Sequence, residues 1–217
     1  LRIDKIKEIR ADVDQVDIDG KAILFESGIY AKIPADLPEK LALSALDVAG
    51  APAQTAKLVK PGDTVLIIGA GGKSGMLCCY EAKKRAGVTG KVIGLCHSQR
   101  STERLQKLGF SADATQPVPV MEKIAELTNG EMCDITINNV NITDTEMTSI
   151  LCTKNDGLVY FFSMATSFTK AALGAEGVGS DVTMIVGNGY TKGHAEITLQ
   201  ELRESEALRK IFTELYA

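Results

Sequence analysis

A glycine-rich segment, Gly69-Ala70-Gly71-Gly72-Lys73-Ser74-Gly75, constrains the fold of this 217-residue chain more than any other feature. The apolar run over residues 64–69 predicts a strand before it, and residues 74–86 predict a helix after it. In such a unit Gly69 permits the tight turn, and Gly71 and Gly72 let the backbone approach a pyrophosphate. Free N–H groups at the start of the helix would bind the phosphates. The segment therefore predicts a nucleotide-binding site.

The spacing of these glycines departs from the simplest dinucleotide fingerprint. Gly69, Gly71 and Gly75 form GxGxxxG, and Ser74 stands where the third glycine of GxGxxG would fall. Either Ser74 is tolerated at that place, or the turn holds one extra residue and Gly75 takes over. In the second case Gly75 is the residue without a side chain where the helix approaches the sheet.

The triplet Gly72-Lys73-Ser74 also resembles the phosphate loop of NTPases. That loop needs a glycine at position 67, where this chain has Ile67 inside the predicted strand. The pattern therefore disfavours an NTPase, although Lys73 remains a candidate phosphate contact. A tight turn in a sheet that binds no nucleotide is the other alternative.

Strand-like and helix-like segments alternate along most of the chain. We expect strands over residues 64–69, 91–96, 112–115, 134–139, 158–162 and 181–186. We expect helices over residues 39–59 with an interruption near Gly50, and over 74–86, 101–109, 118–127, 144–152 and 195–216. Strands joined by helical crossovers predict an α/β fold, a doubly wound, Rossmann-like parallel sheet of about six strands. Residues 1–40 are irregular and strand-like, with a turn expected at Asp19-Gly20.

The choice of dinucleotide depends on the residues that follow the second predicted strand. NAD enzymes usually place an acid there for the ribose 2′-hydroxyl, whereas this chain has no acid before Glu103. Ser98, Arg100 and Ser101 could instead hold a 2′-phosphate through charge-assisted hydrogen bonds. Alternatively, Arg100 is solvated and Ser101 only caps a helix. The cofactor prediction is therefore NADP or NAD.

The nicotinamide end of the cofactor should lie near the carboxyl ends of later strands. Those ends are Asn138-Asn139-Val140 and Ser163-Met164-Ala165. Backbone groups around Asn139, Val140, Ser163 and Met164 could bind the carboxamide. Asn139 could equally be an ordinary turn residue.

Composition excludes several classes of partner. The net charge of −4 gives no reason to expect nucleic acid or an anionic membrane. No run approaches the roughly 20 apolar residues of a membrane span, and no signal peptide is recognised. The five cysteines are odd in number and lack CxxC spacing, which favours reduced core thiols in a cytoplasmic protein over a disulfide framework.

Candidates for the chemistry are few. His97 falls in the loop that should select the cofactor, and His194 and Lys192 lie near the start of the last predicted helix. Asp47 stands in an apolar stretch, where burial would raise its pKa, or it is a helix-face carboxylate paired nearby. No set of Cys, His and acid has zinc-ligand spacing, so we predict no metal and assign no catalytic residue.

Several motifs resemble those of the medium-chain dehydrogenase superfamily. Residues 60–72, Lys-Pro-Gly-Asp-Thr-Val-Leu-Ile-Ile-Gly-Ala-Gly-Gly, look like the entry to its cofactor domain, and residues 22–62 resemble the link from its catalytic domain. Within that superfamily the chain is similar to the L-erythro-3,5-diaminohexanoate dehydrogenases. The shared segments are 47–54 (Asp-Val-Ala-Gly-Ala-Pro-Ala-Gln), 69–75, 138–141 (Asn-Asn-Val-Asn) and 187–194 (Gly-Asn-Gly-Tyr-Thr-Lys-Gly-His).

This resemblance implies an activity and an organisation. The activity would be oxidative deamination of the 3-amino group of an amino-acid substrate during lysine fermentation, with reduction of a nicotinamide cofactor. Residues 1–43 would be a remnant of the catalytic domain with its link, 44–190 the dinucleotide-binding domain, and 191–217 a C-terminal helical segment. Asp47 stands where zinc-using relatives can place a Cys ligand. We also expect a homodimer; an alcohol dehydrogenase of the same superfamily and a non-catalytic dinucleotide-binding module are the competing interpretations.

Overall fold

The structure, a computed structural model, describes residues 1–110, 112–114, 120–187 and 189–217, with only the backbone for 112–114. Contacts divide the chain into two compact units, Leu1–Lys32 and Ile33–Ala217. The division falls earlier than the boundary expected at residue 43. Residues 191–217 belong to the same compact unit as the sheet.

The first unit is built around an antiparallel hairpin of β1 (Arg2–Arg10) and β2 (Gln15–Lys21). A short 3-10 turn, Ala11–Val13, and Asp14 with a φ of 52° connect the two strands. The expected turn at Asp19-Gly20 is wrong. Gly20 lies inside β2, where a Cβ atom would come within 2.6 Å of the Arg2 carbonyl oxygen, so this glycine serves the close approach of two strands.

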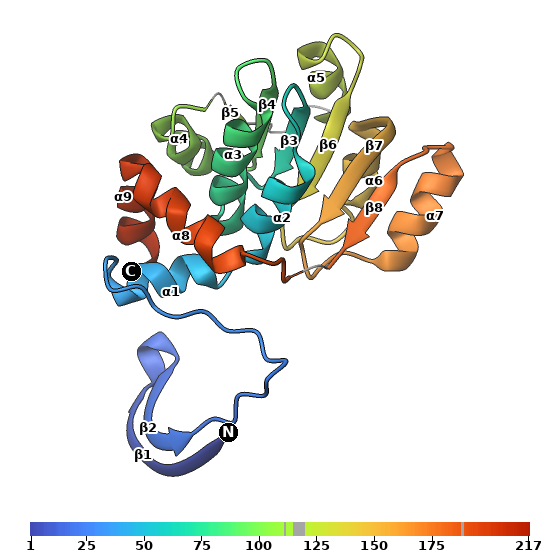
Figure 1. The fold of residues 1–217 in the computed structure, drawn as a ribbon. Helices are drawn as coiled ribbons and strands as arrows, with labels where there is room; N and C mark the ends of the chain where they lie inside the picture. The colour runs from blue at the N-terminus through green and yellow to red at the C-terminus, as the bar shows by residue number, and fades with distance from the viewer. Residues whose placement is uncertain (111, 115–119, 188) are drawn as a thin grey trace. The chain divides into compact units, whose positions relative to one another are not determined.

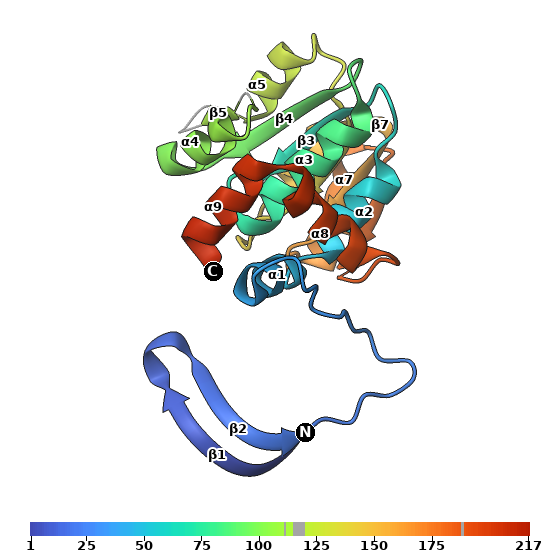
Figure 2. The ribbon, with the colours of Figure 1, turned by 60° about the vertical axis from the view of Figure 1, so that its left-hand side comes forward.

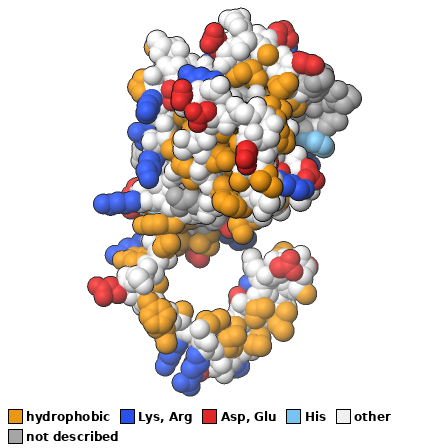
Figure 3. Space-filling view, turned by 90° about the vertical axis from the view of Figure 1, so that its right-hand side faces the viewer, with side chains coloured by type: hydrophobic (Ala, Val, Ile, Leu, Met, Phe, Trp, Pro, Cys, Tyr) orange, Lys and Arg blue, Asp and Glu red, His pale blue; other side chains and the backbone are white. Residues whose placement is uncertain are grey.

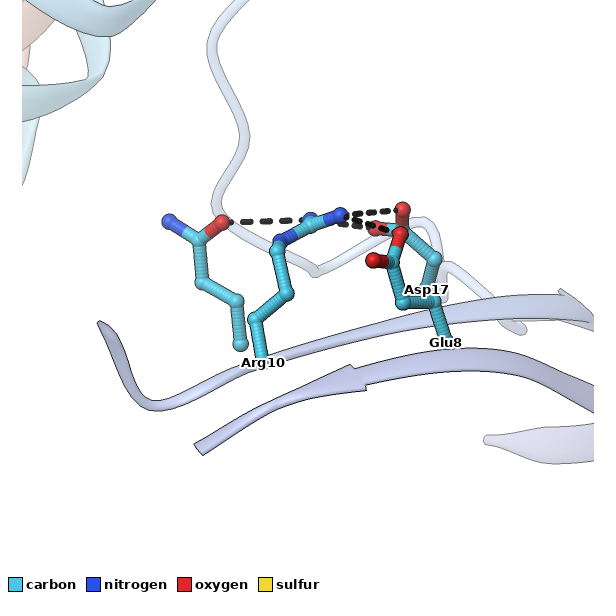
Figure 4. A network of polar contacts seen from close by, with 4 residues as sticks. Glu8, Arg10 and Asp17 are labelled. Atoms are coloured by element: carbon cyan, nitrogen blue, oxygen red, sulfur yellow. Dashed lines mark hydrogen bonds and ion pairs between the residues drawn. The ribbon is translucent and has the colours of Figure 1, made fainter. Parts of the chain in front are cut away.

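An ion-pair network fixes the end of this hairpin (Figure 4). The guanidinium of Arg10 donates from both terminal nitrogens to the two carboxylate oxygens of Asp17, at 2.7 Å each. The same group reaches Glu8 at 3.0 Å and Gln15 at 3.2 Å. This bidentate pair holds the two strands in register next to the turn.

The second unit contains a six-stranded parallel sheet, which confirms the predicted fold class (Figure 1). The strands are β3 (Thr64–Ile68), β4 (Lys91–Cys96), β5 (Ala112–Ala114), β6 (Cys133–Asn138), β7 (Thr153–Phe161) and β8 (Thr183–Val186), in the order β5-β4-β3-β6-β7-β8. Ile67 of β3 stands opposite Gly94 on one side and Ile137 on the other. The strand order reverses between β3 and β6, and ligands of open α/β sheets bind outside the carboxyl ends of the strands at such a point.

Helices cover both faces of this sheet (Figures 1 and 2). They are α1 (Glu39–Leu46), α2 (Gly50–Leu58), α3 (Lys73–Ala86), α4 (Gln99–Lys107), α5 (Val120–Leu127), α6 (Glu146–Leu151), α7 (Phe168–Val178), α8 (His194–Glu204) and α9 (Glu206–Tyr216). Alternate residues of β3 serve the two layers: Val65 and Ile67 pack with α2, α3 and α4, whereas Leu66 and Ile68 pack with α5. Helices α1, α8 and α9 form a further core with α3.

Two buried glutamates lie on the helices of this core. Glu81 of α3 and Glu201 of α8 are both buried, and Glu81 accepts a 2.7 Å hydrogen bond from Arg85. The second oxygen of Glu81 and both oxygens of Glu201 have no hydrogen-bond partner in the described part of the chain. Burial, reinforced by the charge of Glu81, raises the pKa of Glu201 well above its ordinary value.

Some boundaries differ from expectation. The final helix is two helices, separated at Ser205, whose hydroxyl caps α9. Helix α7 was not expected, because Gly174 and Gly177 lower helix propensity. Strand β7 begins at Thr153, five residues before the expected start at residue 158, and includes a register irregularity; Asp156 within it has a φ of 61°. Of the expected elements, Thr115 and residues 118–119 lie outside the described residues.

Candidate functional site

The glycine segment forms a tight turn between β3 and α3. Gly69 has a φ of 82°, and the N–H groups of Gly69 and Ala70 both donate to the Leu95 carbonyl of β4, at 3.0 and 3.1 Å. A Cβ atom on Gly69 would meet the Val140 side chain at 2.6 Å. The turn therefore lies tightly between β4 and the residues that follow β6, at the point where the strand order reverses.

The structure decides between the two interpretations of the glycine spacing. A Cβ atom at Gly75 would come within 2.1 Å of the Gly69 carbonyl oxygen and 2.8 Å of the Ala70 Cα. Ser74 is buried one position earlier without such a conflict. Gly75 is therefore the residue that lets the helix approach the turn, and the turn holds one extra residue.

The start of α3 is open. Its N-cap residue is Gly72, which offers no capping side chain. Met76 is the first residue of the helix whose N–H reaches a backbone carbonyl, that of Gly72, at 3.0 Å. The preceding N–H groups of Lys73, Ser74 and Gly75 have no backbone acceptor among the described residues, so they and the helix dipole are available to an anion.

Lys73, the first residue of α3, is directed to a carboxylate. Its ammonium lies 3.1 Å from Oδ2 of Asp47, the residue that ends α1, and 5.0 Å from the centre of the Tyr216 ring. The Asp47 side chain is 66% exposed. The idea that Asp47 is buried is therefore wrong, and the alternative, a helix-face carboxylate paired nearby, is confirmed.

The loop after β4 lies beside this turn, and it leads into a helix that has a side-chain cap. Ser98 is the N-cap of α4, and its hydroxyl accepts the Ser101 N–H at 3.2 Å and lies 3.0 Å from the Ser101 hydroxyl. The expectation that Ser101 caps the helix is wrong by one turn, because Ser101 is inside the first turn that Ser98 caps. Arg100 is exposed.

Close packing joins the two loops. A Cβ atom at Gly71 would lie 2.6 Å from the Ser101 Cβ, so Gly71 lets the turn touch α4. Arg104 of α4 also reaches the turn, donating to the Gly71 carbonyl at 3.4 Å. Sequence reasoning missed Arg104, although its place three residues after Ser101 on the same helix face could have indicated it.

A pocket of about 350 Å³ lies at the carboxyl ends of β6, β7 and β8. Three of the four residues expected at the nicotinamide end line this pocket: Asn139, Ser163 and Met164. Val140 instead covers Gly69. The other lining residues are Asp47, Asn141, Phe162, Gly187 and Gly189.

The backbone around this pocket is fixed by two close contacts. A Cβ atom at Gly50 would come within 2.2 Å of the Gly189 carbonyl oxygen, so α2 begins directly against this segment. The Ser163 hydroxyl accepts the Ala165 N–H at 3.1 Å, which shapes the turn after β7. Asn188, part of the segment 187–194 quoted above, lies outside the described residues.

Asn139 joins the pocket to the core. Its N–H donates to the Ile68 carbonyl at 3.0 Å, and its side-chain oxygen lies 3.8 Å from the Cys78 thiol. Burial raises the pKa of that thiol to about 12, so Cys78 is a neutral donor. The Asn139 amide nitrogen is buried without a hydrogen-bond partner in the described part of the chain.

The remaining candidates lie apart from the pocket. His194 is the first residue of α8, with its ring 5.1 Å from that of Tyr190, and Lys192 lines a separate cavity beside α2. All five cysteines are free and buried, as predicted. In the ranges that the structure describes, no three His, Cys, Asp or Glu side chains could together hold a metal. Within the same ranges no helix is long and apolar enough to cross a membrane.

Comparison with known proteins agrees with this arrangement. Residues 1–34 match the family described as L-erythro-3,5-diaminohexanoate dehydrogenase N-terminal domain. The L-erythro-3,5-diaminohexanoate dehydrogenase of Acetoanaerobium sticklandii is 65% identical over this whole chain, and that of Fusobacterium nucleatum is 59% identical. The chain is a homologue of these enzymes. It spans 64% of the length of each diaminohexanoate dehydrogenase.

Solved structures show the fold. The quinone oxidoreductase of Escherichia coli, complexed with NADPH, superposes with a TM-score of 0.58 at 22% identity, over 85% of this chain and 56% of that one. The fold of residues in the sheet is thus shared with this oxidoreductase.

Proposed function

We propose that the protein to which this chain belongs is a nicotinamide-dependent dehydrogenase that oxidatively deaminates L-erythro-3,5-diaminohexanoate. The observation that carries this proposal is identity of 65% and 59%, over the whole chain, to two enzymes of that name. The site adds support, because an open helix start and a pocket lie at the same edge of one parallel sheet.

The reaction balances as follows. 3,5-Diaminohexanoate with a protonated 3-amino group reacts with water and NAD(P)⁺. The products are 5-amino-3-oxohexanoate, NH4⁺, NAD(P)H and one proton. A bound nicotinamide would supply the acceptor for the hydride from C3, and water would then release the 3-amino group as ammonia. The chain's own contribution is to bind and orient the reactants.

The residues present fit a dinucleotide. Gly75 lets the start of α3 pack closely against the turn, and the N–H groups of residues 73–75 form a helix start without a side-chain cap. We expect Gly69, Gly71, Gly72, Lys73, Ser74 and Gly75 to surround the pyrophosphate, and Asn139, Ser163 and Met164 to lie at the nicotinamide end. Phe162 would form an apolar wall of that pocket.

Spectrophotometry tests the activity. The full protein should reduce NAD⁺ or NADP⁺ with 3,5-diaminohexanoate, which is followed as a rise in absorbance at 340 nm. No rise with either cofactor would refute the proposal. A faster rise with simple alcohols than with the diamine would assign the protein to an alcohol-oxidising branch instead.

The choice between NAD and NADP rests on the loop after β4. Ser98 and Ser101 are engaged with each other, which leaves exposed Arg100 as the group available to a 2′-phosphate. Arg100→Ala should therefore weaken NADP binding far more than NAD binding. Equal loss for both cofactors, measured by fluorescence titration, would contradict this assignment; Arg100→Lys, which keeps the charge, is the control.

We also propose a homodimer in a cytoplasmic setting. β8 is the last strand of the sheet, and apolar side chains gather on the face around it (Figure 3), with Phe168 70%, Leu173 62% and Val186 36% exposed. Free, buried cysteines fit a reducing compartment. Light scattering coupled to size exclusion should give twice the mass of one full chain, and a monomer would refute the dimer.

A further inference from the structure

Asp47 is the one charged side chain among the described residues that line the pocket at the ends of β6, β7 and β8. The other lining groups are amides, a hydroxyl, glycine backbone and the apolar side chains of Phe162 and Met164. Its place is fixed by the fold, because Asp47 is the C-cap of α1, and Gly50, three residues later, packs closely against Gly189 of the same pocket. The pocket therefore has one fixed negative charge.

The carboxylate of Asp47 is only half engaged. Lys73 contacts Oδ2 at 3.1 Å, and Oδ1 has no partner in the described part of the chain. Lys73 is itself held over the Tyr216 ring. Oδ1 is therefore the oxygen of this two-thirds exposed carboxylate that is available to a ligand.

From this geometry we infer that Asp47 binds an ammonium group of the substrate and makes the site selective for amines. This inference rests on the proposed function, which places the reacting carbon beside the same pocket. A diamino acid carries two cationic groups, and a carboxylate binds an ammonium by charge-assisted hydrogen bonds that a hydroxyl cannot reproduce. Asp47 is thus a specificity-determining residue, with Lys73 as the group that positions it.

The variant Asp47→Asn in the full protein tests the inference. It keeps the size of the side chain and removes the charge, so KM for 3,5-diaminohexanoate should rise at least about tenfold, with a smaller change in kcat. The dissociation constant for the cofactor is measured in the same variant, because Asp47 pairs with Lys73, which is expected at the pyrophosphate. It should change much less than KM does. Asp47→Glu should recover part of the affinity.

Asp36→Asn is the matched control. It also removes a half-exposed carboxylate from an ion pair, that of Asp36 with Arg203 at 2.7 Å, but it lies outside the pocket. Its KM should equal that of the unmodified protein. Equal KM values for Asp47→Asn and the unmodified protein would overturn the inference while leaving the proposed function standing.

Two further measurements separate the possible failures. Calorimetry with 3,5-diaminohexanoate in the presence of cofactor reports binding even if no turnover occurs, so it tests Asp47 independently of the reaction. Loss of binding in Asp47→Asn supports the inference, and unchanged binding refutes it. Metal analysis of both proteins provides the other check: a stoichiometric metal that disappears in Asp47→Asn would make Asp47 a metal ligand and overturn the role proposed here.

Discussion

Two helices begin at the same edge of the sheet, directly after neighbouring strands, and their starts are built in opposite ways. Helix α4 is closed by Ser98, whose hydroxyl accepts an N–H of its own first turn. Helix α3 begins at Gly72, which has no side chain to offer, and the N–H groups of its first turn are left without a backbone acceptor among the described residues.

The start of α3 lacks the stabilisation that a serine N-cap gives to the start of α4. A serine N-cap stabilises a helix by about 1 kcal/mol relative to alanine, and α4, α7 and α9 all use one. A helix in the core of the fold that lacks this contribution keeps its N–H groups free for a ligand. Helices α1, α2, α6 and α8 also lack a side-chain cap, so the position of α3 directly after the glycine turn is what makes its N–H groups a candidate anion site.

The largest effect should come from closing the turn before α3. Gly75→Ala places a Cβ atom 2.1 Å from the Gly69 carbonyl oxygen, so the turn must move. We expect cofactor affinity to fall by about 100-fold or more and the free energy of unfolding to drop by about 1–3 kcal/mol. Titration with cofactor and chemical denaturation measure the two.

Gly177→Ala is its control, since a Cβ atom at that position in α7 meets nothing within 4 Å. This variant should bind cofactor normally and gain about 0.5–1 kcal/mol of stability from the higher helix propensity of alanine. A Gly75→Ala protein that binds cofactor as well as Gly177→Ala would remove the turn from the site.

We expect an intermediate loss of cofactor affinity when a side-chain cap is added to the start of α3. Gly72→Ser adds a hydroxyl that can accept an N–H of α3, as Ser98 does for α4. Its Cβ atom would meet only the Gly69 carbonyl oxygen, at 3.3 Å. Cofactor affinity should fall by about tenfold, while stability without cofactor rises by a few tenths of a kcal/mol. Gly72→Ala, which adds volume but no acceptor, separates the two contributions; stronger cofactor binding in Gly72→Ser would contradict the comparison.

The smallest effect on cofactor affinity is expected from removing the cap of α4. Ser98→Ala should lower the free energy of unfolding by about 1 kcal/mol, because the Ser101 N–H loses its acceptor. NAD affinity should change little, in contrast to Gly72→Ser. Ser98→Asp restores an acceptor and should restore stability in thermal unfolding; a large loss of NAD affinity in Ser98→Ala would place this hydroxyl in the cofactor site.

Much of the fold could be predicted because local patterns determine it. The buried strands are continuous apolar runs, and the glycine turn is recognisable from spacing alone. Helix α7 could not be predicted, since its glycines look unfavourable until the packing is known: a Cβ atom at Gly174 would lie 2.5 Å from the Met147 sulfur of α6. Tertiary packing therefore explains a residue that propensity argues against.

Some features of the candidate site could also be predicted from local sequence patterns, and others could not. The phosphate turn and the strand ends that form the pocket could be placed, because parallel strands bring their carboxyl ends to one edge. The contacts of Arg104 with Gly71, and of Asp47 with Lys73, join residues about 30 positions apart through side chains. No spacing rule covers such pairs. The N-cap role of Ser98 was missed, because a cap and a ligand contact use the same residue type; its predicted contact with the cofactor stays a prediction.

Burial of Glu201 near the charge of Glu81 makes the stability of the protein depend on pH. The folded state holds a proton on Glu201 that the unfolded chain releases near its ordinary pKa of about 4.5, so this residue reduces stability as pH rises above that value. Storage and crystallisation should therefore favour mildly acidic buffers over alkaline ones. Glu201→Gln should flatten this slope, raising the melting temperature more at pH 8 than at pH 5, which makes the seam between α3 and α8 a first choice for engineering a more durable enzyme.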